Sequence, residues 1–76
     1  MGATVKNIEA LIEDGGEITL GAGDANECWA TANDGHNCLA MLVRRDGESL
    51  NALLKRLDKA IAKSRDSGDV IDEVNR

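Results

Sequence analysis

The sequence lacks proline, phenylalanine and tyrosine, and it contains a single tryptophan and a single histidine among 76 residues. Without large aromatic side chains, the core has to be built from aliphatic residues. A chain of this length forms at most one domain and buries only about 60% of the surface that its unfolded state exposes. One such core supplies little free energy, so self-association becomes more favourable than in an average domain.

Long apolar runs are also missing. The longest one, Cys38 to Val43, is too short to cross a bilayer, and residues 1–14 contain no run that could form the core of a signal peptide. We therefore expect a cytoplasmic protein that does not contact the membrane, from a bacterium or a mobile element.

Metal-binding and nucleophilic side chains are scarce. Cys28, His36 and Cys38 supply three zinc ligands where a structural site usually has four, and the fourth would have to be Asp34 or come from a second chain. On one strand, the Cα atoms of His36 and Cys38 would lie about 6–7 Å apart, too far for a nucleophile and its base. We predict no metal, no cofactor, no catalytic residue, and two reduced thiols that do not pair.

Residues near 4–14 have the pattern of a helix. Thr4 suits the N-cap position, and two glycines at 15–16 favour a helix end. The apolar residues recur at three- and four-residue intervals: Val5, Ile8, Leu11 and Ile12. A short strand over residues 17–20 and a loop over residues 21–26 are expected next.

The sequence Asn33-Asp34-Gly35-His36 predicts a hairpin, because Asp-Gly suits the positive φ angles of a two-residue turn. The strands are expected over residues 27–32 and 37–45, with Trp29 opposite Ala40. One face is then predicted to lie under helices: Cys28, Ala30, Ala32, Leu39, Met41 and Val43. The other face is half apolar: Glu27, Trp29, Thr31, Cys38, Ala40 and Leu42. A loop one residue longer would exchange the faces of one strand.

A long second helix is predicted after the turn at Asp46-Gly47. Ser49 suits its N-cap, and Gly68 is placed to end it. Its apolar residues form one stripe at helical spacing: Leu50, Leu53, Leu54, Leu57, Ala60 and Ile61. The acidic tail that follows has three apolar residues spaced to dock in a groove: Val70, Ile71 and Val74.

The predicted order is helix, strand, strand, strand, helix and tail. This order is typical of an α+β domain, a two-layer sandwich in which two helices cover one face of a three-stranded antiparallel sheet. We place the domain at residues 1–68 and the acidic tail at residues 69–76.

Charge is distributed unevenly along the chain. The net charge is −6 over residues 1–38, +4 over residues 39–65 and −3 over residues 66–76. The basic residues of the middle segment are Arg44, Arg45, Lys55, Arg56, Lys59, Lys63 and Arg65. Such a basic face could contact nucleic-acid phosphates. However, the acidic total and the lack of base-reading motifs favour an ordinary solvated face.

Trp29 is the other candidate binding residue. Tryptophan is enriched in protein interfaces, although it could equally fill a core that has no phenylalanine. With no catalytic set, these features predict a non-catalytic protein-interaction module, a regulator or inhibitor that forms a homodimer around Trp29. The alternative is a nucleic-acid-binding accessory protein that uses the basic face of the second helix.

The segment from Arg44 to Ile61 resembles the strand–turn–helix junction of HicB-type antitoxin domains, through Asp46-Gly47-Glu48-Ser49-Leu50 and the leucine-rich helix behind it. Those domains are small sheets flanked by a helix, and the resemblance implies an antitoxin that binds a toxin partner. The chain departs from the pattern because it starts with a helix and lacks a recognisable DNA-binding tail. No residue role follows from this resemblance.

Overall fold

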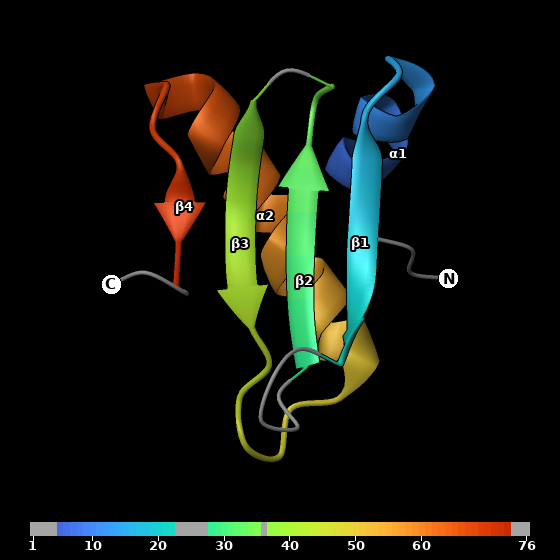
Figure 1. The fold of residues 1–76 in the computed structure, drawn as a ribbon, viewed down its shortest axis with the longest axis vertical. Coiled ribbons are helices and arrows are strands. Elements are labelled where there is room, and N and C mark those ends of the chain that lie inside the picture. Colours follow the sequence, from blue (N-terminus) through green and yellow to red (C-terminus); the bar gives the residue numbers. More distant parts are fainter. Residues whose placement is uncertain (1–4, 23–27, 36, 74–76) are drawn as a thin grey trace.

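In the computed structural model, residues 5–22, 28–35 and 37–73 are described. The elements in chain order are α1 (Lys6–Glu13), β1 (Glu17–Ala22), β2 (Cys28–Asn33), β3 (Cys38–Val43), α2 (Leu50–Ser67) and β4 (Ile71–Asp72). Both helices lie on the same face of the sheet, behind it in Figure 1. The predicted α+β sandwich is therefore confirmed.

The sheet has one more strand than the sequence predicted. Its order is β1-β2-β3-β4, with antiparallel pairing among the first three strands and parallel pairing between β3 and β4. Strand β4 comes from the segment predicted as an acidic tail, and Ile71 lies opposite Ala40 on β3. Part of that segment therefore completes one edge of the sheet (Figure 1).

Helix α1 receives its N-terminal cap from α2. The N-cap residue Val5 makes no side-chain capping bond, and the predicted cap Thr4 lies outside the described residues. Instead, the Asp58 carboxylate accepts a hydrogen bond from the Ile8 amide at 2.9 Å and one from Asn7 Nδ2 at 3.0 Å. Asp58 is buried. This contact fixes the start of α1 against α2.

Both ends of α2 are the predicted ones. Ser49 Oγ accepts a hydrogen bond from the Ala52 amide at 3.1 Å, as an N-cap does. Gly68 adopts the left-handed conformation, with φ of 80°, and its amide donates to the Ser64 carbonyl at 2.7 Å. Local sequence signals are therefore sufficient to set the length of this helix.

The core combines large residues of the helices with alanines of the sheet. Its largest fully buried side chains are Leu11, Leu42, Leu53, Leu57 and Ile61, and the buried sheet alanines are Ala30, Ala32 and Ala40. Alanine lets the helices approach the sheet closely. Gly16 serves the same purpose at the end of α1, since a Cβ there would lie 2.7 Å from the Asn33 carbonyl oxygen. The first residue of the predicted stripe, Leu50, is 46% exposed.

The predicted register of the β2–β3 hairpin is wrong. Trp29 lies opposite Val43 and not opposite Ala40. The turn closes between Asp34 and Asn37, whose backbone groups bond at 3.0 Å, so Asp34-Gly35 is not its central pair. A β-bulge between Ala32 and Asn33 adds a further shift.

This shift exchanges most of the predicted faces of β3. Ala40 and Leu42, predicted on the open face, are buried beneath the helices. Met41 and Val43, predicted beneath the helices, alternate with those residues and lie on the open face. Leu39, near the bulge, packs against the core as predicted. The predicted face residue Glu27 lies outside the described residues.

Candidate functional site

The open face of the sheet, on the side away from both helices, is the first candidate surface. We call four half-buried residues that share this face the open-face patch: Trp29, Thr31, Met41 and Val43. None of them is charged. Glu17 on β1 and Asp72 on β4 lie at the two margins of the same face. In the part of the chain that the structure describes, no helix covers this face (Figure 1).

Trp29 lies on the face for which the sequence predicted it. It alternates along β2 with Ala30, which is fully buried beneath the helices. The wrong register did not affect this position, because it displaced β3 along β2 and left the faces of β2 unchanged. The binding role of Trp29 stays a prediction.

Arg56 lies at the centre of an ion-pair cluster at the edge of the sheet where β3 and β4 pair. Its guanidinium donates to both Glu48 carboxylate oxygens, from Nε at 2.7 Å and from Nη2 at 2.9 Å. Nη2 also donates to the Val43 carbonyl at 2.8 Å, and Nη1 donates to Glu73 Oε2 at 2.8 Å. We call Glu48, Arg56 and Glu73 the Arg56 cluster. It joins α2, the loop before α2 and the segment after β4.

Glu73, directly after β4, contacts β3, α2 and the loop between them. Its amide donates to the Met41 carbonyl at 2.8 Å, and its Oε1 accepts from the Val43 amide at 3.1 Å. Its Oε2 receives the Arg56 bond and lies 3.7 Å from Arg45 Nη2. This one residue therefore supplies main-chain and side-chain contacts along the β3 edge.

Two further predicted basic residues also contact Glu48. The Arg45 amide donates to Glu48 Oε1 at 2.9 Å, and Arg44 Nε donates to the Glu48 carbonyl at 2.6 Å. Arg65 pairs with Asp14 at 3.8 Å across the two helices. Much of the positive charge that the sequence shows in this region is thus paired within the molecule.

Three lysines of α2 remain on its exposed surface: Lys55, Lys59 and Lys63. They are four residues apart, so their Cα atoms follow one side of the helix at intervals of about 6 Å. No ion pair joins them to another described residue. This lysine row is the part of the predicted basic face that could meet an anionic partner.

We expect the Arg56 cluster to make folding stability depend on pH in acid. The hydrogen bonds from Arg56, and then that from the Arg45 amide, lower the pKa of Glu48 from 4.5 to about 2. The unfolded chain therefore binds this proton first, and the stabilisation is present above about pH 4.5 and lost as the pH falls towards 2. This contribution to the free energy of unfolding is about 1–3 kcal/mol, and the upper value applies to an ion pair that is fully shielded from solvent.

Urea denaturation at pH 5, 3.5 and about 2.5 would measure this loss. A Glu48→Gln variant is the matched control, since it cannot titrate and should lose less stability over the same range. Equal losses in the two proteins would contradict the assignment to Glu48.

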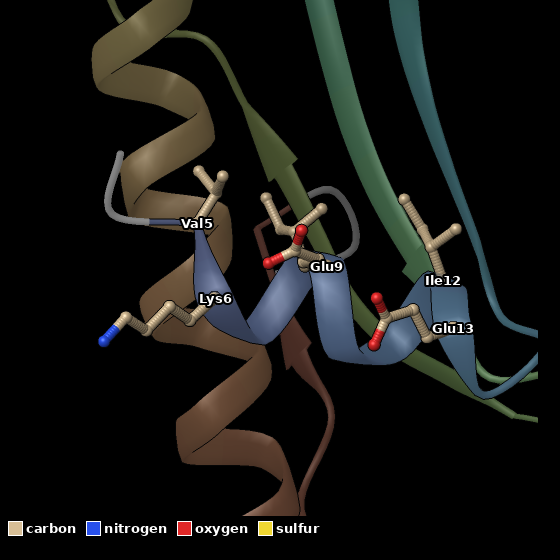
Figure 2. A pocket seen from close by; sticks show the side chains of 6 residues that line it. Val5, Lys6, Glu9, Ile12 and Glu13 are labelled. Atoms are coloured by element: carbon tan, nitrogen blue, oxygen red, sulfur yellow. The ribbon is translucent and has the colours of Figure 1, made fainter. Parts of the chain in front are cut away.

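A hollow of about 440 Å³ lies along α1. Its apolar lining comes from Val5, Ile8 and Ile12, of which Ile12 is 52% exposed. Figure 2 shows Glu9 and Glu13 on the same side of the helix, and Lys6 also lines the hollow, so the apolar lining has a charged border that is acidic on balance. This surface could receive an apolar or basic group, but no described residue occupies it.

Cys38 lies in a second hollow, between the start of β3 and the end of α2, which Ser64 and Arg65 also line. Burial raises the pKa of its thiol, and the nearby Asp72 raises it further, although a backbone hydrogen bond with Ala40 acts in the opposite direction. Cys38 is therefore mainly a neutral thiol and a poor nucleophile at neutral pH.

The two cysteines lie near opposite ends of β2. Cys28 pairs with Ala22, whereas Cys38 pairs with Asn33. Five residues along a strand separate them by about 16 Å, well beyond the reach of a disulfide. Cys38 is a free cysteine.

No group of three metal-binding side chains occurs among residues 5–22, 28–35 and 37–73. His36 and the side chain of Cys28 lie outside what the structure describes. The Cys-His-Cys spacing is therefore not tested by this observation.

The organising roles of Asp58, Glu48 and Glu73 were not among the predictions from the sequence. A signal existed for Asp58, which follows Leu57 directly and precedes Ile61 by three residues, so the stripe itself places it on the apolar side of α2. No comparable signal existed for Glu48 and Glu73. Their meeting at Arg56 depends on where β4 returns to the sheet.

Comparison of the chain with protein-family models, with curated proteins and with solved structures finds no match. The HicB-type resemblance therefore stays a prediction from the sequence. None of the described helices is long and apolar enough to cross a membrane.

Proposed function

We propose that the chain is a small non-catalytic protein-interaction module that forms a homodimer through the open-face patch. The observation that carries the proposal is the one-sided arrangement of the layers: α1 and α2 cover one face of the sheet, and Trp29, Met41 and Val43 share the other. A contiguous apolar patch on a protein surface often marks a site of interaction with another molecule.

A second copy fits this face better than a charged partner does. The patch contains no charged side chain, so a two-fold arrangement brings it against itself without repulsion. Three strands of six residues with β4 beside them give a face of roughly 300–400 Å². Two copies would bury about 600–800 Å² in total, below the roughly 1,200 Å² of a stable interface, so the dimer should be weak and dependent on concentration.

Trp29→Ala should dissociate this dimer. The wild-type chain of 8.1 kDa is expected to approach twice that mass in light scattering as its concentration rises, whereas the variant stays at the monomer mass. The reason is that tryptophan residues at interface centres contribute a large share of the binding energy. The emission maximum of Trp29 should shift to shorter wavelength with concentration in the wild type.

Ile12→Ala is the matched control, because Ile12 is exposed on α1 and away from the open face. It should dimerise as the wild type does. Circular dichroism would establish that both variants fold. A wild-type chain that stays monomeric at every concentration, or a folded Trp29→Ala variant that still dimerises, would refute the proposed interface.

Contact with nucleic-acid phosphates is a second candidate function, favoured by the exposed row of Lys55, Lys59 and Lys63. A gel shift with single- and double-stranded DNA and RNA at about 50 and 200 mM salt would test it, because each phosphate contact steepens the salt dependence. Replacing all three lysines with alanine should abolish any shift that they cause. No shift at the lower salt concentration would exclude this function.

A further inference from the structure

The edge of β3 that carries β4 has the contacts of a peptide-binding site filled by a segment of the same chain. The Glu73 amide donates to the Met41 carbonyl at 2.8 Å, and the Val43 amide donates to the Glu73 carboxylate at 3.1 Å. Main-chain bonds from a strand edge, combined with recognition of alternate side chains, are the mode by which β-augmentation sites bind extended peptides.

The carboxylate-binding group of this edge is held in place independently of its occupant. Three of the four hydrogen bonds of Arg56 go to Glu48 and to the Val43 carbonyl, and only Nη1 donates to Glu73. If Glu73 left, the guanidinium would stay anchored with Nη1 directed at the vacated position. A pre-arranged arginine of this kind favours a carboxylate ligand.

The side chains of the bound segment define what the edge recognises. Ile71 pairs with Ala40 and packs against the core cluster, whereas Asp72 pairs with Met41 on the other face. Glu73 then meets Arg56, with Arg45 nearby. The pattern is therefore an aliphatic residue, an acidic residue and a glutamate, in an extended conformation parallel to β3.

The bound segment is short and is joined to α2 by exposed residues. Strand β4 contains two residues, and Gly68, Asp69 and Val70 before it are exposed. Segments with few buried apolar contacts open more readily than the rest of a fold. A competing strand that supplies the same contacts could therefore replace β4 while β1, β2 and β3 keep their pairing.

We propose that the β3 edge is a docking site for an extended acidic peptide of a protein partner, with the pattern aliphatic–acidic–Glu, and that the chain's own residues 71–73 occupy it when the partner is absent. This inference rests on the proposed function as an interaction module and names a second surface and its ligand chemistry. Because a short linker gives the attached segment an effective concentration of the order of millimolar, the wild-type chain should bind such a peptide weakly.

The test uses the full chain, as wild type and as Glu73→Gln, with a fluorescent peptide that has the sequence of residues 69–76. In the variant, the attached segment loses its charge-assisted bond to Arg56, so fluorescence anisotropy should show at least about tenfold tighter peptide binding than in the wild type. A second peptide with the same Glu73→Gln change is the matched control and should bind the variant about tenfold more weakly than the first peptide does.

Equal binding of the peptide by both proteins would show that β4 does not compete, and would overturn the proposal. So would a folded variant that binds no peptide at concentrations up to about 1 mM. If the variant does not fold, amide exchange in the wild type decides the question. The Val43 and Glu73 amides should exchange faster than the amides paired between β2 and β3, and exchange only on global unfolding would refute a displaceable strand.

The two proposals fail separately. A chain that is monomeric at all concentrations but binds the peptide would refute the homodimer and keep the edge site. Conversely, the wild type could dimerise and dissociate in Trp29→Ala while the Glu73→Gln variant binds no peptide. That result would refute the edge site and keep the homodimer.

Discussion

Replacing Arg56 with methionine is expected to lower the free energy of unfolding by about 2–4 kcal/mol. The variant would leave the carboxylates of Glu48 and Glu73 without the guanidinium that joins them, with the exposed Arg45 still 3.7 Å from Glu73, and the Val43 carbonyl would lose the hydrogen bond from Arg56. Breaking a buried pair from one side costs about 3–5 kcal/mol, and the 22% exposure of the Arg56 side chain places this cluster at a lower value. Urea denaturation at pH 7 measures the change.

Arg45→Met is the matched control. Its side chain is 67% exposed and its contact with Glu73 is 3.7 Å long, so its removal should cost less than about 0.5 kcal/mol. Equal effects of the two substitutions would mean that the Arg56 cluster is an ordinary surface ion pair. The Arg56 variant should also lose most of the acid dependence assigned to Glu48, because the hydrogen bonds from Arg56 are the largest cause of the lowered pKa of Glu48.

Leu53→Ala and Leu57→Ala should each destabilise the fold by about 2–4 kcal/mol, the usual cost of truncating a core leucine. Both residues are fully buried on the side of α2 that faces the sheet. Because a core of this size supplies only about 3–5 kcal/mol in total, either variant is expected to be largely unfolded at 25 °C. A thermal melt followed by circular dichroism would show a lost or strongly lowered transition.

Leu50→Ala separates core packing from helix formation. Leu50 starts the same stripe but is 46% exposed, so its truncation should change stability by less than about 1 kcal/mol. If Leu50→Ala and Leu57→Ala proved equally harmful, the leucines would act through the helix itself and not through burial against the sheet.

Features that depend on residues close together in the sequence were predicted correctly, whereas features that depend on more distant residues were not. Ser49 and Gly68 bound α2 through bonds to residues three and four positions away, and both predictions are confirmed. The hairpin register depends on a turn that closes between Asp34 and Asn37 and on a bulge beyond it. Neither has a sequence pattern as distinctive as Asp-Gly, and together they moved the partner of Trp29 by three residues.

The charged residues of the candidate site could not be paired correctly from the sequence for the same reason. The sequence predicts Arg56 as one member of a solvated basic face, because it lies beside Lys55 and Lys59 on the side of α2 opposite the leucine stripe. Its actual surroundings come from Glu48 and Glu73, which precede and follow it by 8 and 17 residues. Helical periodicity describes the faces of one element and does not say which other element returns to cover them.

The capping of α1 by Asp58 determines when during synthesis this helix can become stable. Helix α1 has eight residues, fewer than an isolated helix needs in water, and its own N-cap makes no side-chain bond. The carboxylate that it requires lies 50 residues further along the chain. Helix α1 therefore has to wait for α2 to emerge from the ribosome and fold, and a nascent chain that stops before residue 58 would hold α1 as coil.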